Sequence, residues 1–364
     1  MLTNQFKKIT TYVPGIILAL ILYLLSEGIN NVIGTELMGY EKSPISTVMV
    51  AIIIGIIMGN AFIPRHGFMI GLHFTQTYIL KLGIICLGIG LSFSEFIKFG
   101  TIAIPLIITC IISVLVLIKL LIKRFKISSK MSYLIAIGTS VCGATAIVAT
   151  APVINAKKGE VAYAIANITL FGVFSMLVYP YFANLYFDGN SLYAGLFLGT
   201  AIHETSQVAA AGMIYDQQFN SPETLNIATV TKLIRNTFLV IMIPLFGYLY
   251  NRGNTEGKTV SILNIFPYFV LGFIGMIIFR NFGDQVVQLQ NYSTESWSMF
   301  ISYTKDLAKI CLTMAMAAVG MSTNLGELKE MGYKPFVVGL IAAVTVGLVS
   351  ILTIQSFEKI TSLL

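Results

Sequence analysis

The sequence predicts an all-α polytopic membrane protein that forms a single membrane domain over residues 1–364. Hydrophobic residues make up 56% of the chain, and its mean hydropathy is +0.84. Charged residues make up only 11%, whereas soluble domains carry roughly 25% because water must wet their surface. Apolar runs of about 20 residues, the length that crosses hydrocarbon as a helix, recur throughout the chain.

Eleven apolar segments predict about eleven transmembrane helices joined by short connections. The first follows Lys7 and Lys8 and lacks a small-residue cleavage site, so we expect a retained helix. The polar stretch 281–300 contains the only tryptophan, Trp297, which suits the membrane interface. The segments lie at about 12–25, 45–62, 74–94, 101–122, 132–155, 161–183, 192–214, 224–250, 260–280, 301–323 and 335–357.

The formal net charge of +7 is spread over the connections, with no basic domain that would indicate nucleic-acid binding. Lys and Arg accumulate in cytoplasmic loops of membrane proteins. With eleven crossings, a cytoplasmic N-terminus places eleven loop Lys and Arg residues inside and six outside, which predicts an outside C-terminus. Lys157 and Lys158 oppose this orientation. The four cysteines lie in apolar segments and match no metal motif.

Three segments are rich in Gly, Ala, Ser and Thr, at 138–153, 199–212 and 315–328. Small residues let membrane helices pack closely, which is one interpretation. The other is a helix broken in the membrane, whose free N–H groups form an anion site. On that interpretation Gly143 opens a half-helix in the fifth segment. The polar residues around the two proposed breaks are Thr139, Ser140 and Thr145 in the fifth segment and Ser322, Thr323 and Asn324 in the tenth.

Charged residues at membrane depth are costly, by at least ~2.5 kcal/mol at a helix centre, and they mark candidate functional sites. Lys232, Arg235 and Asn236 share one face of the eighth segment, which must look inward. Either Glu204 neutralises Lys232 or Arg235 in a structural ion pair, or the two bases clamp an oxyanion. The polar block of the seventh segment contributes His203, Glu204, Thr205, Ser206 and Gln207.

Two pairs of short stretches look alike within the chain. Residues 138–146 (GTSVCGATA) loosely resemble 199–207 (GTAIHETSQ), and 90–96 resemble 320–326. Neither pair is separated by five helices, the offset expected for two inverted halves. We interpret both pairs as similarities of composition.

The stretches 138–166, 199–212, 232–236 and 316–325 together resemble the YeiH-type family of bacterial inner-membrane proteins, which are named as sulfate exporters. The family is similar in fold to bile-acid symporters and cation–proton antiporters. The resemblance implies inverted five-helix repeats after an extra N-terminal helix at 12–25, at about 45–183 and 192–357. It also implies crossed discontinuous helices in a core domain, which fall on the fifth and tenth segments here.

The expected function is that of a secondary transporter of a small anion, such as sulfate or a related sulfur oxyanion, working by alternating access. H⁺ or Na⁺ is the expected coupling ion, and the resemblance suggests a homodimer in the cytoplasmic membrane. The alternative is a cation/proton antiporter in which Glu204 titrates. We expect no enzymatic activity, metal or cofactor, because no nucleophile–base pair meets and no Walker motif is present.

Overall fold

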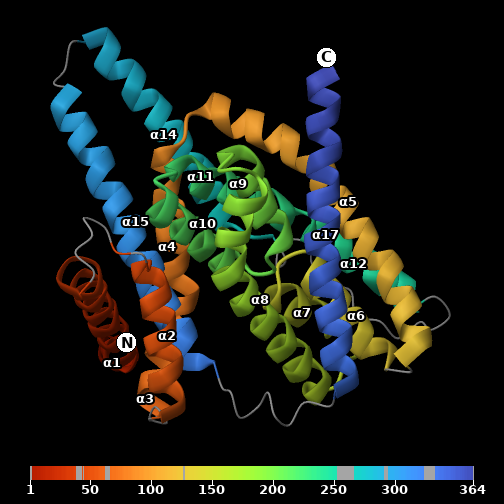
Figure 1. Cartoon of the computed structure of the whole chain (residues 1–364). Helices are drawn as coiled ribbons and strands as arrows, with labels where there is room; N and C mark the ends of the chain where they lie inside the picture. Colours follow the sequence, from red (N-terminus) through yellow and green to blue (C-terminus); the bar gives the residue numbers. More distant parts are fainter. Residues whose placement is uncertain are drawn as a thin grey trace. The chain divides into compact units, whose positions relative to one another are not determined.

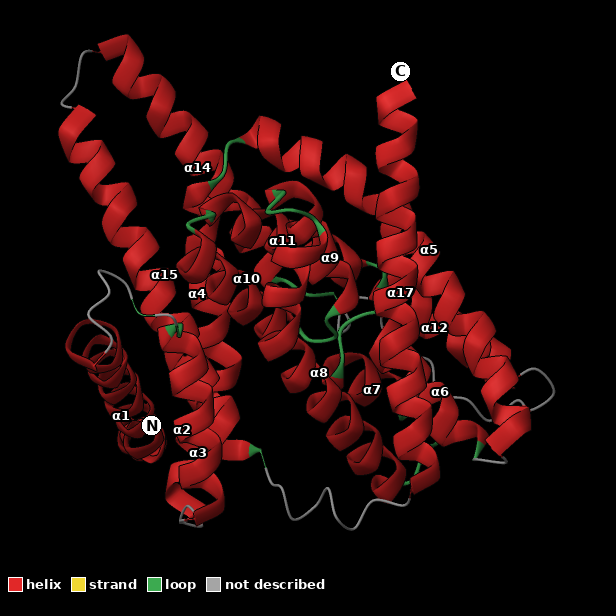
Figure 2. Ribbon diagram, in the orientation of Figure 1, coloured by secondary structure: helices red, strands yellow, loops and turns green. Residues whose placement is uncertain are grey.

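The computed structural model describes residues 2–37, 43, 45–61, 66–125, 128–251, 266–290, 294–323 and 333–363. Among these residues the secondary structure is helical, with no strand, which confirms the all-α polytopic prediction (Figure 2). In the described part of the chain, seven helices are long and apolar enough to cross a membrane by length and composition, and two shorter apolar helices accompany them.

The chain forms two compact units. The first contains residues 1–95, 213–222 and 269–325, and the second contains the remainder. The helices of the first unit are α1 (Leu2–Asn31), η1 (Val32–Leu37), α2 (Thr47–Ala61), α3 (His66–Phe74), η2 (Thr75–Ile79), α4 (Leu80–Leu87), η3 (Gly88–Gly90), α14 (Phe269–Gln290) and α15 (Thr294–Ser322). Those of the second are α5 (Phe93–Phe125), which begins in the first, α6 (Ser129–Ser140), α7 (Ala144–Thr150), α8 (Lys158–Tyr186), α9 (Ser191–Ala201), α10 (Thr205–Phe219), which ends in the first, α11 (Pro222–Thr237), α12 (Leu239–Asn251) and α17 (Tyr333–Leu363).

Helix α15 runs without interruption from Thr294 to Ser322 and ends within the stretch 320–324, where the break in the tenth segment is predicted. Residues 324–332 lie outside the described part of the chain, so this break stays a prediction. The small residues of α15 serve close packing. A Cβ atom added at Gly320 would lie 2.5 Å from the Ile52 carbonyl oxygen of α2, and one at Gly55 would lie 2.5 Å from the Ala317 carbonyl oxygen. The two backbones therefore touch where only glycine leaves room, as small-residue membrane interfaces require.

The predicted break in the fifth segment is confirmed. Helix α6 ends at Ser140, and α7 begins at Ala144 after Gly143, whose φ of +64° is readily available only to glycine. The seventh segment is also interrupted, because α9 ends at Ala201 and α10 begins at Thr205. Figure 2 shows such interruptions as short loops among the helices of this unit.

The α6–α7 segment begins and finishes at the same end of the second unit, so we name it hairpin 1 (residues 129–155). Ser128, which caps α6, donates a hydrogen bond to Glu160 at the start of α8. Lys130 near the start of α6 donates to the Asn155 carbonyl after α7. Both ends of the segment therefore lie together. A helix of 12 residues is about 18 Å long, which is too short to cross hydrocarbon.

The α9–α10 segment is built in the same way, and we name it hairpin 2 (residues 191–219). Thr224 at the start of α11 donates to the Ser191 carbonyl at the start of α9. Gly195 and Gly199 of α9 then pack against successive turns of α11, at Ile227 and Thr231. Helices α9 and α11 therefore run parallel from one end, and α10 returns to that end.

The two hairpins approach the middle of the second unit from opposite ends (Figure 1). Hairpin 1 starts beside the first residues of α8, and hairpin 2 starts after its last residues. Their tips meet around α11, where Arg235 contacts carbonyl groups from both. Eleven apolar segments are thus helical or partly helical where described, but two of them fold back within the unit.

Candidate functional site

The two hairpin tips are equivalent position by position. The two tips coincide with stretches 138–146 and 199–207. From the sequence alone their likeness is interpreted as one of composition. Helices α6 and α9 end at the third residue of their stretches, and α7 and α10 begin at the seventh. The likeness is therefore that of a repeated structural element.

Arg235 of α11 binds the last carbonyl groups of both α6 and α9. Its side chain is fully buried. Nε donates to the Ser140 carbonyl at 2.7 Å and Nη2 donates to that of Thr139, while Nη1 donates to the Thr200 carbonyl at 2.5 Å and to that of Ile202 at 3.4 Å. Thr139 and Thr200 occupy equivalent places in the two tips. One guanidinium thus caps two half-helix C-termini, whose dipoles favour a positive charge.

Lys232 lies one turn earlier on α11 and is also fully buried. Its ammonium group donates to the Val141 carbonyl at 2.9 Å, to the Ile202 carbonyl at 3.0 Å and to the His203 carbonyl. These bonds occupy all three protons of the ammonium group. Backbone oxygens of the two tips therefore engage both bases that the sequence predicts for the site.

Glu204 does not form the ion pair considered from the sequence. Its carboxylate accepts a hydrogen bond from the Ala144 N–H at 3.1 Å, at the start of α7. Among the residues described, the one ion pair within 4 Å joins Arg280 to Asp284. A Cβ atom at Gly143 would lie 2.3 Å from Glu204 Cγ, so the glycine provides the space for this carboxylate. Hairpin 2 thereby caps a half-helix of hairpin 1.

The other polar residues of hairpin 2 hold its own tip. Gln207 accepts from the Glu204 N–H at 3.2 Å and donates to the Thr169 carbonyl of α8 at 3.4 Å. Gly172 of α8 leaves room for this amide, since a Cβ there would lie 1.9 Å from Gln207 Oε1. Asn236 of α11 donates to the Thr205 hydroxyl at 2.9 Å. Residues of the 203–207 block therefore contact α8 and α11, and their role as one wall of a site stays a prediction.

Several buried polar atoms at the tips have no hydrogen-bond partner. They are Thr139 Oγ1, Asn236 Oδ1 and both ring nitrogens of His203, which lies near the Ala201 carbonyl without an ordinary hydrogen-bond geometry. Each of these residues is at most 2% exposed. Ser206 is buried, Glu204 and Thr205 are half-buried, and Thr145 is exposed. Because buried polar groups are usually paired, these unpaired atoms make the tips a candidate binding site.

The described residues of the tenth segment that the sequence predicts for the site belong to the first unit. Ser322 belongs to the first unit, where its hydroxyl accepts from Gln76 Nε2 at 2.7 Å. The Thr323 carbonyl accepts from Asn60 Nδ2 at 2.8 Å. Asn324 lies outside the described residues. Sequence reasoning missed the carbonyl groups of Val141 and Ile202, which accept from Lys232 in the second unit.

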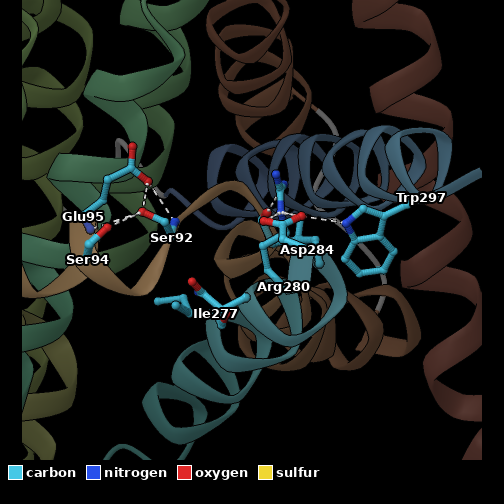
Figure 3. A network of polar contacts seen from close by, with 9 residues as sticks. Ser92, Ser94, Glu95, Ile277, Arg280, Asp284 and Trp297 are labelled. Atoms are coloured by element: carbon cyan, nitrogen blue, oxygen red, sulfur yellow. Dashed lines mark hydrogen bonds and ion pairs between the residues drawn. The ribbon is translucent and has the colours of Figure 1, made fainter. Parts of the chain in front are cut away.

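A second polar network belongs to the first unit (Figure 3). Arg280 pairs with Asp284, which also accepts from the Trp297 indole at 2.7 Å. Ser92 and Glu95 exchange hydrogen bonds at the start of α5, which is a helix-capping arrangement. Trp297 lies in the first turn of α15, so the interfacial stretch around it is largely helical. These contacts fix helix ends, and we assign them no ligand.

Comparisons of the sequence with known proteins show the family of the chain. The family described as "Conserved hypothetical protein 698" matches residues 14–339. A UPF0324 membrane protein of Streptococcus agalactiae is 36% identical over 347 residues, covering 94% of this chain and 97% of that protein. One from Clostridium tetani is 32% identical over 367 residues, covering 97% and 99%. No solved structure matches the chain. The chain is thus a multi-pass membrane protein that belongs to the UPF0324 family.

Proposed function

We propose that this protein is a secondary transporter of a small anion, such as sulfate or a related sulfur oxyanion, working by alternating access. The observation that carries the proposal is the meeting of two oppositely directed hairpins around the buried Lys232 and Arg235. Half-helix ends in the middle of a membrane protein are a recurring architecture of transporter binding sites. The resemblance to the YeiH-type exporters supports the same substrate class.

The charges at the tips favour an anion. Lys232 and Arg235 stand against the single carboxylate of Glu204. The two half-helix C-termini and the two N-termini contribute partial charges of opposite sign that offset one another. With all three side chains ionised, one net positive charge remains in a region of low dielectric, where an unbalanced charge is costly. An anion at the tips restores neutrality.

The alternative is a cation/proton antiporter that uses Glu204 as the titrating acid. Its support is the placement of this carboxylate at the tips, half-buried and bound to the Ala144 N–H. Two buried cations near that carboxylate oppose the binding of another cation. We also propose that the protein is not an enzyme, that it needs no cofactor, and that H⁺ or Na⁺ couples transport.

The hairpins also bear on the proposed orientation. Because hairpin 1 returns to the end at which it starts, Lys157 and Lys158 lie on the same side as Lys130. Moving these two lysines changes the basic-residue count from eleven against six to thirteen against four. The residues that opposed the orientation now support it. We propose a cytoplasmic N-terminus and an outside C-terminus in the cell membrane, with nine crossings and two hairpins.

Anion flux into proteoliposomes tests the function. Purified protein is reconstituted, and uptake of sulfate, sulfite, thiosulfate and chloride is measured with and without a pH gradient. We expect at least one sulfur oxyanion to enter faster than in protein-free vesicles. Uptake of none of them, together with Na⁺- or K⁺-driven proton release, would support the antiporter instead.

Glu204→Gln and Glu223→Gln form a matched pair for the coupling. Both remove one carboxylate, but Glu223 is exposed at the start of α11. Gln at residue 204 keeps an oxygen for the Ala144 N–H while it removes a titratable group from the tips. We expect Glu204→Gln to change the dependence of uptake on the pH gradient and Glu223→Gln to leave it as in the wild type. Equal profiles for all three proteins would exclude Glu204 from coupling.

A further inference from the structure

The substrate class can be narrowed from the hydrogen-bonding groups at the start of α10, on the basis of the proposed function. Helix α10 has 15 residues, and its first carbonyl-bonded N–H is that of Val208, which donates to Glu204 at 3.0 Å. The N–H groups of Thr205, Ser206 and Gln207 precede this bond, so they are the free donors that every helix start presents. Together with the helix dipole they favour an anion.

Asn236 adds an acceptor to these donors. Its Nδ2 binds the Thr205 hydroxyl, which fixes the amide beside the first residue of α10. Its Oδ1 has no partner, although the residue is only 2% exposed. An acceptor buried without a partner costs free energy, and a bare oxyanion cannot satisfy it because such an anion only accepts. A ligand that carries a hydroxyl on its oxyanion group can.

The cations limit the charge of the ligand. The three donors of the Lys232 ammonium are engaged by carbonyl groups of the tips, and four of the five N–H groups of Arg235 are engaged in the same way. A dianion therefore finds few free charged donors to offset its larger desolvation cost. With Glu204 ionised, the tips carry one net positive charge, which a monoanion neutralises.

We propose that the transported ligand is a monoanion that retains an acidic O–H, a class that includes hydrogensulfite, bicarbonate and dihydrogen phosphate. Its deprotonated oxygens accept from the first N–H groups of α10, and its O–H donates to Asn236 Oδ1. Among the sulfur oxyanions of the proposed function, this inference favours a protonated one such as hydrogensulfite, and it makes sulfate, a fully deprotonated dianion, a poor ligand. In the tip of hairpin 2 (residues 199–207), the half-buried Glu204 and Thr205 are the residues that remain accessible to a ligand.

Two tetrahedral monoanions of nearly equal shape distinguish the effect of ligand charge on transport from the effect of a donated hydrogen bond. In a mildly acidic buffer methylphosphonate is a monoanion with one O–H, whereas methanesulfonate is a monoanion with none. Labelled forms of both, and labelled sulfate, are offered separately to proteoliposomes with the wild-type protein. We expect hydrogen methylphosphonate to enter about tenfold faster than methanesulfonate, the factor of one hydrogen bond, and sulfate to enter most slowly.

Variants of α11 locate the effect. Asn236→Leu removes the acceptor and should bring the ratio of the two rates close to one. Thr231→Val is the matched control, because it removes a buried hydroxyl five residues earlier on α11, on the side that packs against Gly199. It should keep the wild-type ratio. If Asn236→Leu fails to fold, Thr205→Val, which releases the amide of Asn236, should lower the ratio in its place.

The outcomes distinguish this inference from the proposed function. Transport of methanesulfonate or sulfate as fast as hydrogen methylphosphonate by the wild type would overturn the inference and leave anion transport intact. An unchanged ratio in a folded Asn236→Leu protein would also overturn it. Failure of every anion, including those in the first flux assay, would instead overturn the proposed function, and the inference with it.

Discussion

Arg235→Ala should destabilise the protein strongly, because this one guanidinium holds the ends of two half-helices. The side chain is fully buried and makes three short hydrogen bonds, to the carbonyl groups of Thr139, Ser140 and Thr200. A hydrogen bond to a charged group contributes about 1.5–3 kcal/mol. Three at the lower limit give a loss of about 4–5 kcal/mol in the free energy of unfolding. Arg235→Lys keeps the charge but not the fork, and should fall between Ala and the wild type.

Thermal unfolding in detergent measures this effect with a thiol-reactive dye. The four cysteines are buried and free, so the dye reports their exposure as the protein unfolds. At 2–4 °C for each kcal/mol, we expect Arg235→Ala to lower Tm by roughly 10 °C or more. Arg280→Ala is the matched control, because Arg280 is partly exposed and its ion pair with Asp284 contributes ~1 kcal/mol or less.

A small effect would refute the reasoning. If Arg235→Ala unfolds within about 2 °C of Arg280→Ala, the carbonyl groups of the two tips do not depend on the guanidinium. The prediction also bears on transport assays. Loss of flux in Arg235→Ala would follow from loss of the hairpin tips, and would not by itself show that Arg235 contacts the substrate.

Three further predictions concern the hairpins and the helix contacts. Cysteines placed at the exposed Ser129 and Lys158 should both react with an impermeant maleimide from one side of the membrane. Cysteines at the exposed Asn190 and Asn220 should react from the other side. Labelling of positions 129 and 158 from opposite sides would mean that hairpin 1 crosses the membrane. Gly143→Ala should lower the free energy of unfolding by about 1–3 kcal/mol, because it places a Cβ at positive φ against Glu204. Gly159→Ala is its control, because there is open space around Gly159, and it should be neutral or stabilising in the same melting assay. Gly55→Val should separate α2 from α15 and lower Tm, whereas Gly275→Ala in α14 should not; equal Tm values would show that the close contact is not needed.

The sequence identified the broken helix of the fifth segment, and the break has a physical cause. Gly143 must adopt a positive φ, so the small residues of the fifth segment mark a real interruption. The same composition at 315–322 instead lets α15 lie against α2. Small residues permit both outcomes, and composition does not distinguish them. The likeness of 138–146 to 199–207 indicated that the seventh segment is interrupted in the same way as the fifth. The offset of five helices expected for inverted halves pointed to the tenth segment instead.

The polar residues of the seventh and eighth segments were found because charge and polarity are costly at membrane depth. Residues 203–207 and 232–236 do meet in the structure. Their roles were harder to predict. The groups that engage Lys232 and Arg235 are backbone carbonyls, which every residue possesses, so no side-chain pattern announces them.

The sequence by itself determined that this chain lies in a membrane as a set of helices, because hydrocarbon excludes unpaired backbone groups and accepts apolar side chains. It also determined that buried charge lies at 204 and 232–236. The tertiary structure alone decided that two segments turn back before crossing, and that their ends share one arginine and one lysine. Those decisions depend on which carbonyl groups lie within reach of a cation, and distance between residues far apart in the chain exists only once the chain has folded.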